Sequence, residues 1–486
     1  MATSLNSQML KHGSYVNGQW LNVSDDIIEV TNPANGSLVL SIKGCSADDA
    51  SAAVGAAKAA LPEWRSKTAK QRTALLRRWF DLITQNQDDL AAILTAEQGK
   101  PLAEAKGEIA YGANYIEWFA EEAKRVYGDT IPSAGSNSRI VVIKQAVGVV
   151  AAITPWNFPN AMITRKAAPA MAAGCTFIVK AATETPLSAL ALAELAEQAG
   201  IPKGVFNVLV SKHSSAVGKV LTQDPRIAKF SFTGSTPVGK ILLSQCATTV
   251  KKTSMELGGN APFIVFNDAN IEEAIKGLMI SKYRNAGQTC VCTNRVLVQS
   301  DIYDTFADKL SQAVAQLKVG AGDAKGVEIG PLINQDASDS VASLVQDAIA
   351  GGAKLLIGGG RHSAGGLFFE PTVLTDVLPQ MKVATEEIFG PVAPLIRFET
   401  EQQAIDIAND TEVGLAAYMY SRDIGRVWRV SEALEYGMVG INEGIISNEM
   451  APFGGVKQSG MGREGSKYGI EDYLEIKYLC MGGIGS

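Results

Sequence analysis

The chain has 486 residues, of which 46% are hydrophobic and 19% are charged. This composition is typical of a globular protein, and the length predicts two or three domains rather than one core. The formal net charge of −6 gives no electrostatic reason to expect nucleic acid or an anionic membrane as a partner.

The six cysteines are scattered apart from one close pair, and they do not form the spacing of a disulfide framework. They are Cys45, Cys175, Cys246, Cys290, Cys292 and Cys480. The N-terminal residues predict no secretory signal, and the most hydrophobic stretch (140–153) is too short to cross a bilayer. We therefore expect a cytoplasmic, enzyme-sized protein in a reducing compartment.

The first part of the chain predicts short strands followed by helices. Residues 15–20 resemble a strand and turn. Apolar residues recur at helical spacing from Ala47 to about Leu61 and from Ala69 to Asn86. The segment 98–101, Gln-Gly-Lys-Pro, predicts the end of one helix and the start of a long one that continues toward Arg125.

From Val149 to Glu256, β-branched runs alternate regularly with helical stretches. The predicted strands are 149–154, 176–180, 206–210 and 229–233, and the helices include 188–199 and 236–246. This alternation predicts right-handed βαβ crossovers and a doubly wound, mostly parallel sheet that binds a nucleotide.

A second alternating block runs from about Phe263 to Ile396. Its predicted strands are 262–266, 295–299 and 354–357. The alternating stretch Tyr473–Leu479 could pair outside its own domain. Two α/β domains fit this pattern best.

Cys290 follows the small and polar residues Asn285 to Thr289 and is the candidate nucleophile. A thiol with the reference pKa of about 8.5 attacks well only where its surroundings favour the thiolate. The three histidines (His12, His213 and His362) all lie in polar or Gly/Ser-rich stretches. A Cys-His or Ser-His-Asp hydrolase and a histidine-based metal site are therefore disfavoured, and we expect no metal.

Two polar residues end apolar strands and are candidates for acid–base and oxyanion chemistry. Glu256 lies between an apolar strand and two glycines, where desolvation would raise its pKa toward that of a general base. Asn157 lies in an aromatic–proline loop, where a fixed amide could donate to an oxyanion. The alternatives are a glutamate that is merely hydrogen-bonded at a domain edge and an ordinary turn asparagine.

The segment Gly234–Lys240 imitates a phosphate-binding loop, but Ile241 stands where a magnesium-binding Ser or Thr would be needed. We therefore reject an NTPase. Because the loop follows a strand and opens a helix, its amides could hold a pyrophosphate, or it could be an ordinary βα turn.

Lys180 closes another strand of the same predicted sheet, and Thr183 follows it with Glu184 alongside. A lysine with a hydroxyl neighbour suits a ribose 2′-phosphate better than a carboxylate would. The alternative is a solvated lysine at a strand end.

Nearly the whole chain resembles the aldehyde dehydrogenase superfamily. The hallmarks occur in the expected order: Pro155–Pro159 (PWNFP), Phe232–Ser235 (FTGS), Glu256–Gly259 (ELGG), Gly287–Cys290 (GQTC) and Glu387–Pro391 (EIFGP). The resemblance implies a Rossmann-like cofactor domain (1–124 and 146–257), an α/β catalytic domain (258–460) and a small oligomerisation β-segment (125–145 and 461–486).

The same resemblance implies roles for individual residues. Cys290 would be the nucleophile, Asn157 and the Cys290 amide the oxyanion hole, and Glu256 the base that activates the deacylating water. The implied cofactor contacts are Thr154, Trp156, Lys180, Thr183, Gly234, Ser235, Glu387 and Phe389. The implied reaction is thiolate attack on an aldehyde, hydride transfer to a nicotinamide, and hydrolysis of the thioester.

Within the superfamily, segments 162–166, 283–292 and 444–449 are similar to the succinate-semialdehyde dehydrogenases. By that resemblance Arg165, Arg284 and Ser447 would hold the far carboxylate of the substrate, through charge-assisted bonds. We expect the two arginines also to help keep Cys290 ionised.

The chain departs from the common family pattern in two places that concern the cofactor and the substrate. Ala181-Ala182 replaces Pro-Ala after the cofactor lysine, which leaves that turn less fixed. Thr183 stands where many NAD-using relatives have Glu, which favours NADP with NAD still possible. Glu443 beside the anchor loop would weaken anionic substrates if it faced inward.

Several alternatives remain open at this stage. Glutarate semialdehyde differs from succinate semialdehyde by one methylene, which a pocket discriminates by only about 1–3 kcal/mol. A broader aldehyde dehydrogenase and a non-catalytic use of the fold are further alternatives. Cys292 either packs or forms a reversible disulfide with Cys290 that switches the enzyme off. The resemblance also implies a homo-oligomer, either a dimer or a tetramer.

Overall fold

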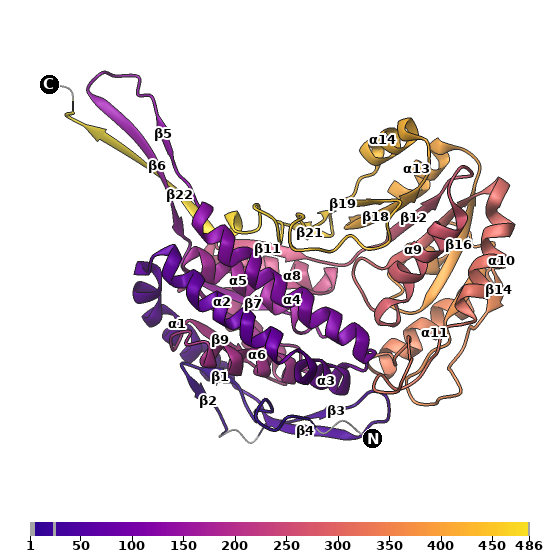
Figure 1. Cartoon of the computed structure of the whole chain (residues 1–486), viewed down its shortest axis with the longest axis horizontal. Helices are drawn as coiled ribbons and strands as arrows, with labels where there is room; N and C mark the ends of the chain where they lie inside the picture. The colour runs from indigo at the N-terminus through magenta and orange to yellow at the C-terminus, as the bar shows by residue number, and fades with distance from the viewer. Residues whose placement is uncertain (1–4, 23–25, 485–486) are drawn as a thin grey trace.

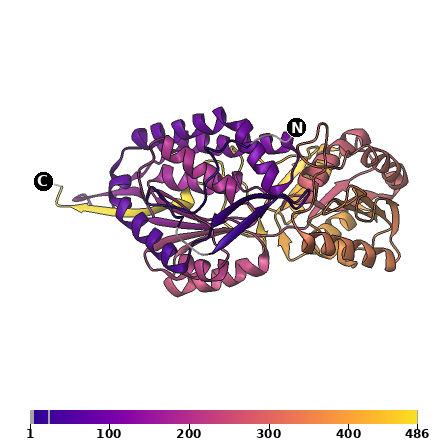
Figure 2. The same ribbon diagram turned by 90° about the horizontal axis from the view of Figure 1, so that it is seen from below.

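The structure is a computed structural model, and it describes residues 5–22 and 26–484. Two α/β parts lie side by side, and a narrow three-stranded sheet projects away from the first of them (Figure 1). Figure 2, turned by 90°, shows the same two parts with the C-terminal strand at the far end of the projection. None of the helices in the described ranges is both long and apolar enough to cross a membrane.

The first part is built on an eight-stranded sheet with a parallel centre. Its strands in spatial order are β2 (Gln19–Trp20), β1 (Tyr15–Val16), β9 (Phe206–Leu209), β8 (Thr176–Lys180), β7 (Val149–Ile153), β10 (Ile227–Thr233), β11 (Lys252–Glu256) and β21 (Gly460–Met461). The chain starts the parallel region at β7, moves outward to β9, and returns to β10 on the other side. The strand order therefore reverses between β7 and β10, and ligands of open α/β sheets bind at the carboxyl ends of such a pair.

Helices cover both faces of this sheet, which explains why nearly every residue of its central strands β7, β8 and β9 is buried. They are α1 (Ala47–Ser66), α2 (Ala69–Gln85), α3 (Gln87–Gln98), α4 (Leu102–Glu122), α5 (Ala161–Ala173), α6 (Pro186–Gln198), α7 (Ser214–Gln223) and α8 (Thr236–Cys246). Along β7, Val150 and Ala152 pack in the cluster formed with α2 to α6. Val149 and Ala151 pack on the opposite face with α1, α7 and α8, as the two-residue period of a strand requires.

The second part is built on a seven-stranded sheet with its own core. Its strands in order are β14 (Lys354–Ile357), β15 (Thr372–Thr375), β16 (Val392–Phe398), β13 (Thr293–Gln299), β12 (Ala261–Val265), β18 (Ala416–Tyr420) and β19 (Met438–Ile441). Only β14 is antiparallel to its neighbour. The helices are α9 (Ile271–Tyr283), α10 (Tyr303–Val314), α11 (Gln335–Ala350), α12 (Lys382–Thr385), α13 (Glu401–Asn409) and α14 (Ile424–Ala433).

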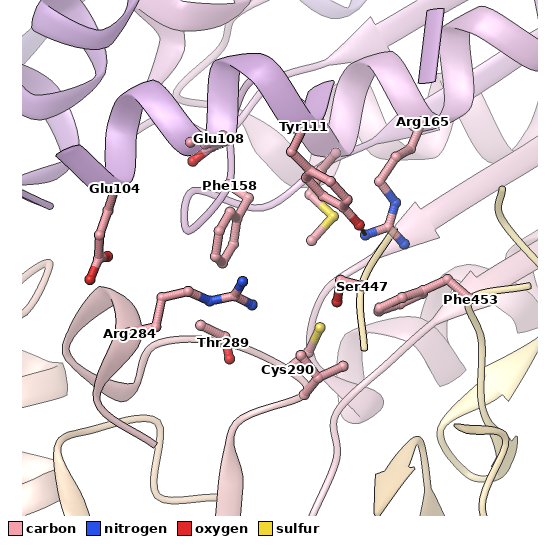
Figure 3. A pocket seen from close by; sticks show the side chains of 13 residues that line it. Glu104, Glu108, Tyr111, Phe158, Arg165, Arg284, Thr289, Cys290, Ser447 and Phe453 are labelled. Carbon is pink, nitrogen blue, oxygen red and sulfur yellow. Dashed lines mark hydrogen bonds between the residues drawn. The ribbon is translucent and has the colours of Figure 1, made fainter. Parts of the chain in front are cut away.

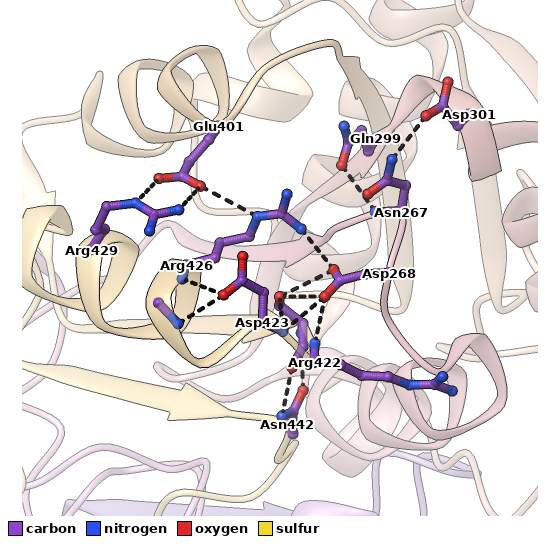
Figure 4. Close-up of polar contacts among 12 residues, drawn as sticks. Asn267, Asp268, Gln299, Asp301, Glu401, Arg422, Asp423, Arg426, Arg429 and Asn442 are labelled. Atoms are coloured by element: carbon purple, nitrogen blue, oxygen red, sulfur yellow. Dashed lines mark hydrogen bonds and ion pairs between the residues drawn. The ribbon is translucent and has the colours of Figure 1, made fainter.

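One carboxylate fixes the connection from β18 to α14 at the edge of the second sheet. Asp268 accepts the backbone N–H groups of Arg422 (2.8 Å) and Asp423 (2.9 Å) and the guanidinium of Arg426 (2.8 Å), as Figure 4 shows. Arg426 also pairs with Glu401 of α13. This network closes the outer end of the second part, away from the junction with the first.

The projection consists of β5 (Asp129–Ile131), β6 (Ser138–Ala146) and β22 (Leu474–Gly482). We call these three strands the arm. β22 is antiparallel to β6 over its whole length, although the two are more than 300 residues apart in the sequence. Ile476, Tyr478 and Met481 of β22 are exposed. Two short pairs complete the strands: β3 (Ile27–Thr31) with β4 (Leu38–Lys43), and β17 (Val413–Gly414) with β20 (Val456–Lys457).

The predicted fold class is confirmed, and most predicted elements occur within one or two residues of their expected bounds. Three differences have physical reasons. α1 continues through Pro62 to Ser66 because Trp64 in its last turn is buried in the core. The second sheet extends beyond Ile396 to β18 and β19, and the C-terminal strand begins at Leu474 because 471–473 form a 3₁₀ turn.

Candidate active site

Cys290 lies at the junction of the two parts, where it lines two cavities of about 240 and 250 Å³. The arginine cavity is lined by Glu104, Gly107, Glu108, Tyr111, Phe158, Met162, Arg165, Arg284, Thr289, Cys290, Val291, Ser447 and Phe453. The Glu256 cavity is lined by Pro155, Trp156, Asn157, Thr233, Gly234, Ser235, Glu256, Leu257, Gly258, Cys290, Glu387 and Phe389. Cys290 is the residue that the two cavities share.

The backbone that carries Cys290 is held in an unusual conformation. After α9, Asn285, Ala286 and Gly287 have φ values of 52°, 54° and 77°. A non-glycine residue in this left-handed region costs about 1–3 kcal/mol and persists only where its surroundings fix it. Gly287 also approaches the Gly390 carbonyl so closely that an added Cβ would lie 2.2 Å from its oxygen. The loop is therefore shaped by tertiary contacts rather than by local preference.

Asn157 lies beside this loop at the carboxyl end of β7. Its Nδ2 donates to the Gln288 carbonyl (3.0 Å), which ties the residue to the Cys290 loop, and the amide carries a second N–H. The Asn157 carbonyl accepts the buried Lys100 Nζ (2.8 Å) and the Asn285 Nδ2 (3.1 Å). Asn157 is therefore fixed at both its side chain and its backbone, which is what an oxyanion donor requires.

Glu256 ends β11 and is buried, and both of its carboxylate oxygens are without a hydrogen-bond partner among the described residues. Burial raises its pKa well above the usual value, and the nearby Glu464 raises it further against the opposing effect of Arg165. Glu464, by contrast, forms ion pairs with both Arg165 and Lys166, which hold its pKa low against its burial. The two neighbouring carboxyls thus have opposite protonation preferences.

The expectation that two arginines keep Cys290 ionised is wrong for the ligand-free protein. Burial raises the pKa of the Cys290 thiol to about 12, and the lowering effects of Arg165 and Arg284 are smaller. Arg165 gives the larger of these two lowering effects, but Glu387 and Glu256 add to the effect of burial. Cys290 therefore holds its proton at neutral pH and needs a base or a further positive charge to lose it.

The three residues predicted to bind a carboxylate line the arginine cavity together with Cys290. Figure 3 shows Arg284 and Ser447 near the Cys290 sulfur, with Arg165 farther along the cavity. Arg284 is partly exposed and lies over the Phe158 ring (5.5 Å). Arg165 is buried, lies over the Phe453 ring (4.0 Å) and is paired with Glu464. The two arginines are thus not equivalent, because only Arg165 is committed to a protein carboxylate.

Glu443 does not enter the arginine cavity. Its Oε1 accepts the N–H groups of Gly444 (2.8 Å) and Ile445 (3.0 Å), and its side chain is exposed. The carboxylate therefore stabilises its own loop and does not repel an anion in the cavity.

Most of the predicted cofactor residues line the Glu256 cavity: Trp156, Gly234, Ser235, Glu387 and Phe389. Trp156 and Phe389 pack edge to face (5.7 Å) at its wall. Ser235 precedes α8, whose first-turn amides receive no side-chain cap, so they are available to an anionic group. Glu387 accepts the Gly259 amide (3.2 Å) across the cavity.

The remaining predicted cofactor residues lie along the same sheet edge but outside that cavity. Thr154 follows β7, and its buried hydroxyl has no partner among the described residues. Lys180 ends β8 and donates to the Thr183 hydroxyl at 3.5 Å. Burial lowers the pKa of Lys180, and Glu184 counteracts this. Thr183 is partly exposed, and its own hydroxyl donates to the Ser211 carbonyl (3.1 Å).

Cys292 is buried and lines neither cavity. Its sulfur lies within hydrogen-bond distance of the carbonyls of Lys282 (3.3 Å) and Thr293 (3.4 Å), and both Cys290 and Cys292 are free thiols. A Cys290–Cys292 disulfide would require Cys292 to leave these two acceptors. The redox switch stays a prediction.

Sequence reasoning missed four residues that shape the site: Glu464, Lys100, Glu108 and Tyr111. Lys100 and Glu108 form a buried ion pair (2.5 Å), and Glu108 also accepts the Asn160 amide at the start of α5 (3.0 Å). Glu108 and Tyr111 lie three residues apart on one face of α4, and this spacing was the only sequence signal that could have placed them together. No group of histidine, cysteine and carboxylate side chains in the described ranges could hold a metal ion.

The profile of the aldehyde dehydrogenase family matches residues 20–479. The chain is 60% identical to an Escherichia coli (strain K12) protein named succinate-semialdehyde dehydrogenase [NADP(+)], over 98% of this chain and 99% of that one. It is also 60% identical to a 3-sulfolactaldehyde dehydrogenase of Pseudomonas putida, with coverage of 98% of each chain. A glutarate-semialdehyde dehydrogenase of Pseudomonas aeruginosa is 59% identical, over 98% of this chain and 99% of that one.

These matches extend over nearly the whole chain and agree with the order of the motifs, the reversal of strand order at β7 and β10, and the cysteine between two cavities. The chain belongs to the aldehyde dehydrogenase family.

Proposed function

We propose that this enzyme oxidises succinate semialdehyde to succinate with NADP as the preferred oxidant and NAD as a possible alternative. The observation that carries the proposal is the position of Cys290 between two cavities of different chemistry. One cavity offers the cation Arg284 and the Ser447 hydroxyl, and the other offers Glu256 and the uncapped start of α8.

Cys290 is the nucleophile in this proposal. Its sulfur adds to the aldehyde carbon, and the carbonyl oxygen that gains negative charge accepts hydrogen bonds from Asn157 and the Cys290 amide. The thiol proton leaves to solvent water before the attack. After oxidation the ionised form of Glu256, whose two oxygens have no other partner among the described residues, takes a proton from a second water. The oxygen of that water attacks the thioester, the carboxylate product is released, and the leaving sulfur takes up the proton from Glu256.

The chain's residues fit a dinucleotide along the carboxyl edge of the first sheet. The α8 amides suit a pyrophosphate, and Lys180 with Thr183 suits a ribose that carries a 2′-phosphate. A bound nicotinamide would accept the hydride in the oxidation step. The residues that would hold it near Cys290 are Trp156, Glu387 and Phe389.

The far carboxylate of the substrate would bind Arg284 and Ser447. Both acidic side chains of the arginine cavity are already engaged, since Glu104 accepts the Asn285 amide (2.7 Å) and Glu108 pairs with Lys100. The cavity therefore presents its positive charge through Arg284, while Arg165 shares its charge with Glu464. Glutarate semialdehyde and a sulfonate-bearing aldehyde also carry an anionic group at the end away from the aldehyde. They are the alternative substrates.

We further propose that the enzyme is a homo-oligomer located in the cytoplasm. The exposed Ile476, Tyr478 and Met481 on the arm support self-association, because a monomer would leave this apolar strand in water. In this proposal residues 125–145 and 461–486 form the oligomerisation segment. Residues 1–124 and 146–257 form the cofactor domain, and residues 258–460 form the catalytic domain.

The carboxylate anchor is tested by Arg284→Gln, which removes the charge at nearly constant size. A charge-assisted hydrogen bond contributes about 1.5–3 kcal/mol, so we expect kcat/KM for succinate semialdehyde to fall roughly 10- to 150-fold. The value for butanal should hardly change. Arg284→Lys is the matched control and should recover part of the loss. An equal loss on both aldehydes would contradict the anchor, and a larger kcat/KM for glutarate semialdehyde would change the assigned substrate.

The cofactor preference is tested by Thr183→Glu, with the neutral Thr183→Gln as the size control. A carboxylate next to a 2′-phosphate is repulsive by several kcal/mol, so the kcat/KM ratio of NADP over NAD should fall by at least about tenfold. The glutamine variant should change this ratio much less. A glutamate variant that still prefers NADP as strongly as the wild type would place the 2′-phosphate elsewhere.

The protonation state of Cys290 predicts a pH dependence for its alkylation by iodoacetamide in the ligand-free enzyme. Because the pKa of Cys290 is about 12, the thiolate fraction is small and still rising throughout the neutral range. The rate should rise about tenfold per pH unit from about pH 7 to about pH 9. Peptide mass spectrometry would follow Cys290 alone. A rate that levels off below about pH 8 would show that the site favours the thiolate.

A further inference from the structure

A chain of hydroxyl groups connects Arg165 with the loop that carries Ser447. Arg165 NH1 donates to the Tyr111 hydroxyl (3.4 Å), and the Tyr111 and Tyr115 hydroxyls are 3.0 Å apart. The Tyr115 hydroxyl donates to the Asn448 carbonyl (3.3 Å). Since each phenol has one proton and that of Tyr115 is used on Asn448, Tyr111 must donate to Tyr115.

The Arg165 end of this chain is fixed. Its guanidinium is buried, ion-paired with Glu464 and packed on the Phe453 ring. Tyr115 is also fully buried, and it packs edge to face with Tyr111 at 5.1 Å. Tyr111 lines the arginine cavity and points toward Arg165 in Figure 3. The hydroxyl chain therefore begins in rigid packing and ends on a loop.

The other end of the hydroxyl chain lies on the loop that carries Ser447. This loop is held by contacts on either side of Ser447. Before it, Gly444 lies so close to α9 that an added Cβ would be 2.2 Å from the Gly277 carbonyl oxygen. After it, the Asn448 Oδ1 accepts the amides of Met450 (3.0 Å) and Ala451 (2.9 Å). The Ser447 hydroxyl itself has no hydrogen-bond partner in the described part of the protein. Its position therefore depends on the contacts of its neighbours, which include Gly444, Asn448 and the Ile446 side chain packed against the second core.

We propose that Tyr115, linked to Arg165 through Tyr111, is a positioning residue that holds Ser447 in place for the far carboxylate of the substrate. This inference rests on the proposed function, because it concerns recognition of that carboxylate. In this view Arg284 supplies the charge that binds the carboxylate directly. Arg165 acts mainly as the fixed end of the hydroxyl chain.

The test is Tyr115→Phe, which removes one oxygen and keeps the ring that packs against Phe119 (6.5 Å). The Asn448 carbonyl then loses its side-chain donor, and Ser447 is held less firmly. The KM for succinate semialdehyde should rise about three- to tenfold, the change expected for one neutral hydrogen bond, with kcat nearly unchanged. The kinetic constants for butanal should stay as they are. Tyr111→Phe keeps the bond from Tyr115 to the Asn448 carbonyl and removes only the link between Tyr115 and Arg165, so its effect on the KM for succinate semialdehyde should be smaller than that of Tyr115→Phe.

Tyr303→Phe is the matched control. Tyr303 is also buried, and its hydroxyl donates to the Leu395 carbonyl (3.0 Å) and accepts the Asp376 amide (2.9 Å). It lines neither cavity. This variant therefore measures the general effect of deleting a bonded phenol oxygen, and it should lower the melting temperature without changing the preference between the two aldehydes.

The double variant Tyr115→Phe/Ser447→Ala tests whether Tyr115 acts through Ser447. If it does, adding Tyr115→Phe to Ser447→Ala should raise the KM for succinate semialdehyde hardly at all. Independent, multiplying effects would overturn the inference, as would an equal loss of Tyr115→Phe on both aldehydes. A wild-type enzyme with no preference for succinate semialdehyde over butanal would instead overturn the proposed function, and the inference with it.

Discussion

The site depends on the side chain of Asn285, which joins three separate segments at the boundary between the two sheets. Its Nδ2 donates to the carbonyls of Asn157 (3.1 Å) and Gln288 (3.2 Å), and its Oδ1 accepts the Gln98 amide (3.0 Å). These bonds tie α3 and the loop after β7 to the loop that carries Cys290. They also compensate for the left-handed backbone at 285–287, which is unfavourable in isolation. The proposed nucleophile and the proposed oxyanion donor thus share one anchor.

Most of the buried charged side chains near this anchor are paired within the protein. The one that is unpaired bears on the proposed catalysis. Lys100 pairs with Glu108, and Glu464 pairs with Arg165 and Lys166, so these ions are compensated within the protein. Glu256 has no such partner, and its burial favours the protonated form. An unpaired buried carboxyl is costly to ionise, and a carboxyl whose pKa is raised in this way suits the proposed role in proton transfer. The carboxylates that are paired within the protein and the one proposed to act in catalysis are therefore different residues.

Much of the fold and the convergence of the candidate residues was predictable from the sequence because the signals were local. The alternation of strands and helices predicted the parallel sheet, and the ordered motifs predicted that Cys290, Asn157 and Glu256 would converge. The role of Glu464 was not predictable, since it lies about 300 residues from Arg165 and only the fold brings them together. For the same reason the expectation of an ionised Cys290 failed: the two arginines were visible in the sequence, but the burial that raises the pKa of Cys290 arises only in the fold.

The central claim is that Cys290 forms a thioester whose hydrolysis depends on Glu256. It is tested most directly by mixing the Glu256→Gln variant with succinate semialdehyde and NADP and measuring the intact mass and the peptide masses. The account predicts a stoichiometric burst of NADPH, slow turnover afterwards, and one succinyl group on the peptide that contains Cys290. A variant that turns over at the wild-type rate without an adduct, or that carries the adduct on another residue, would contradict it.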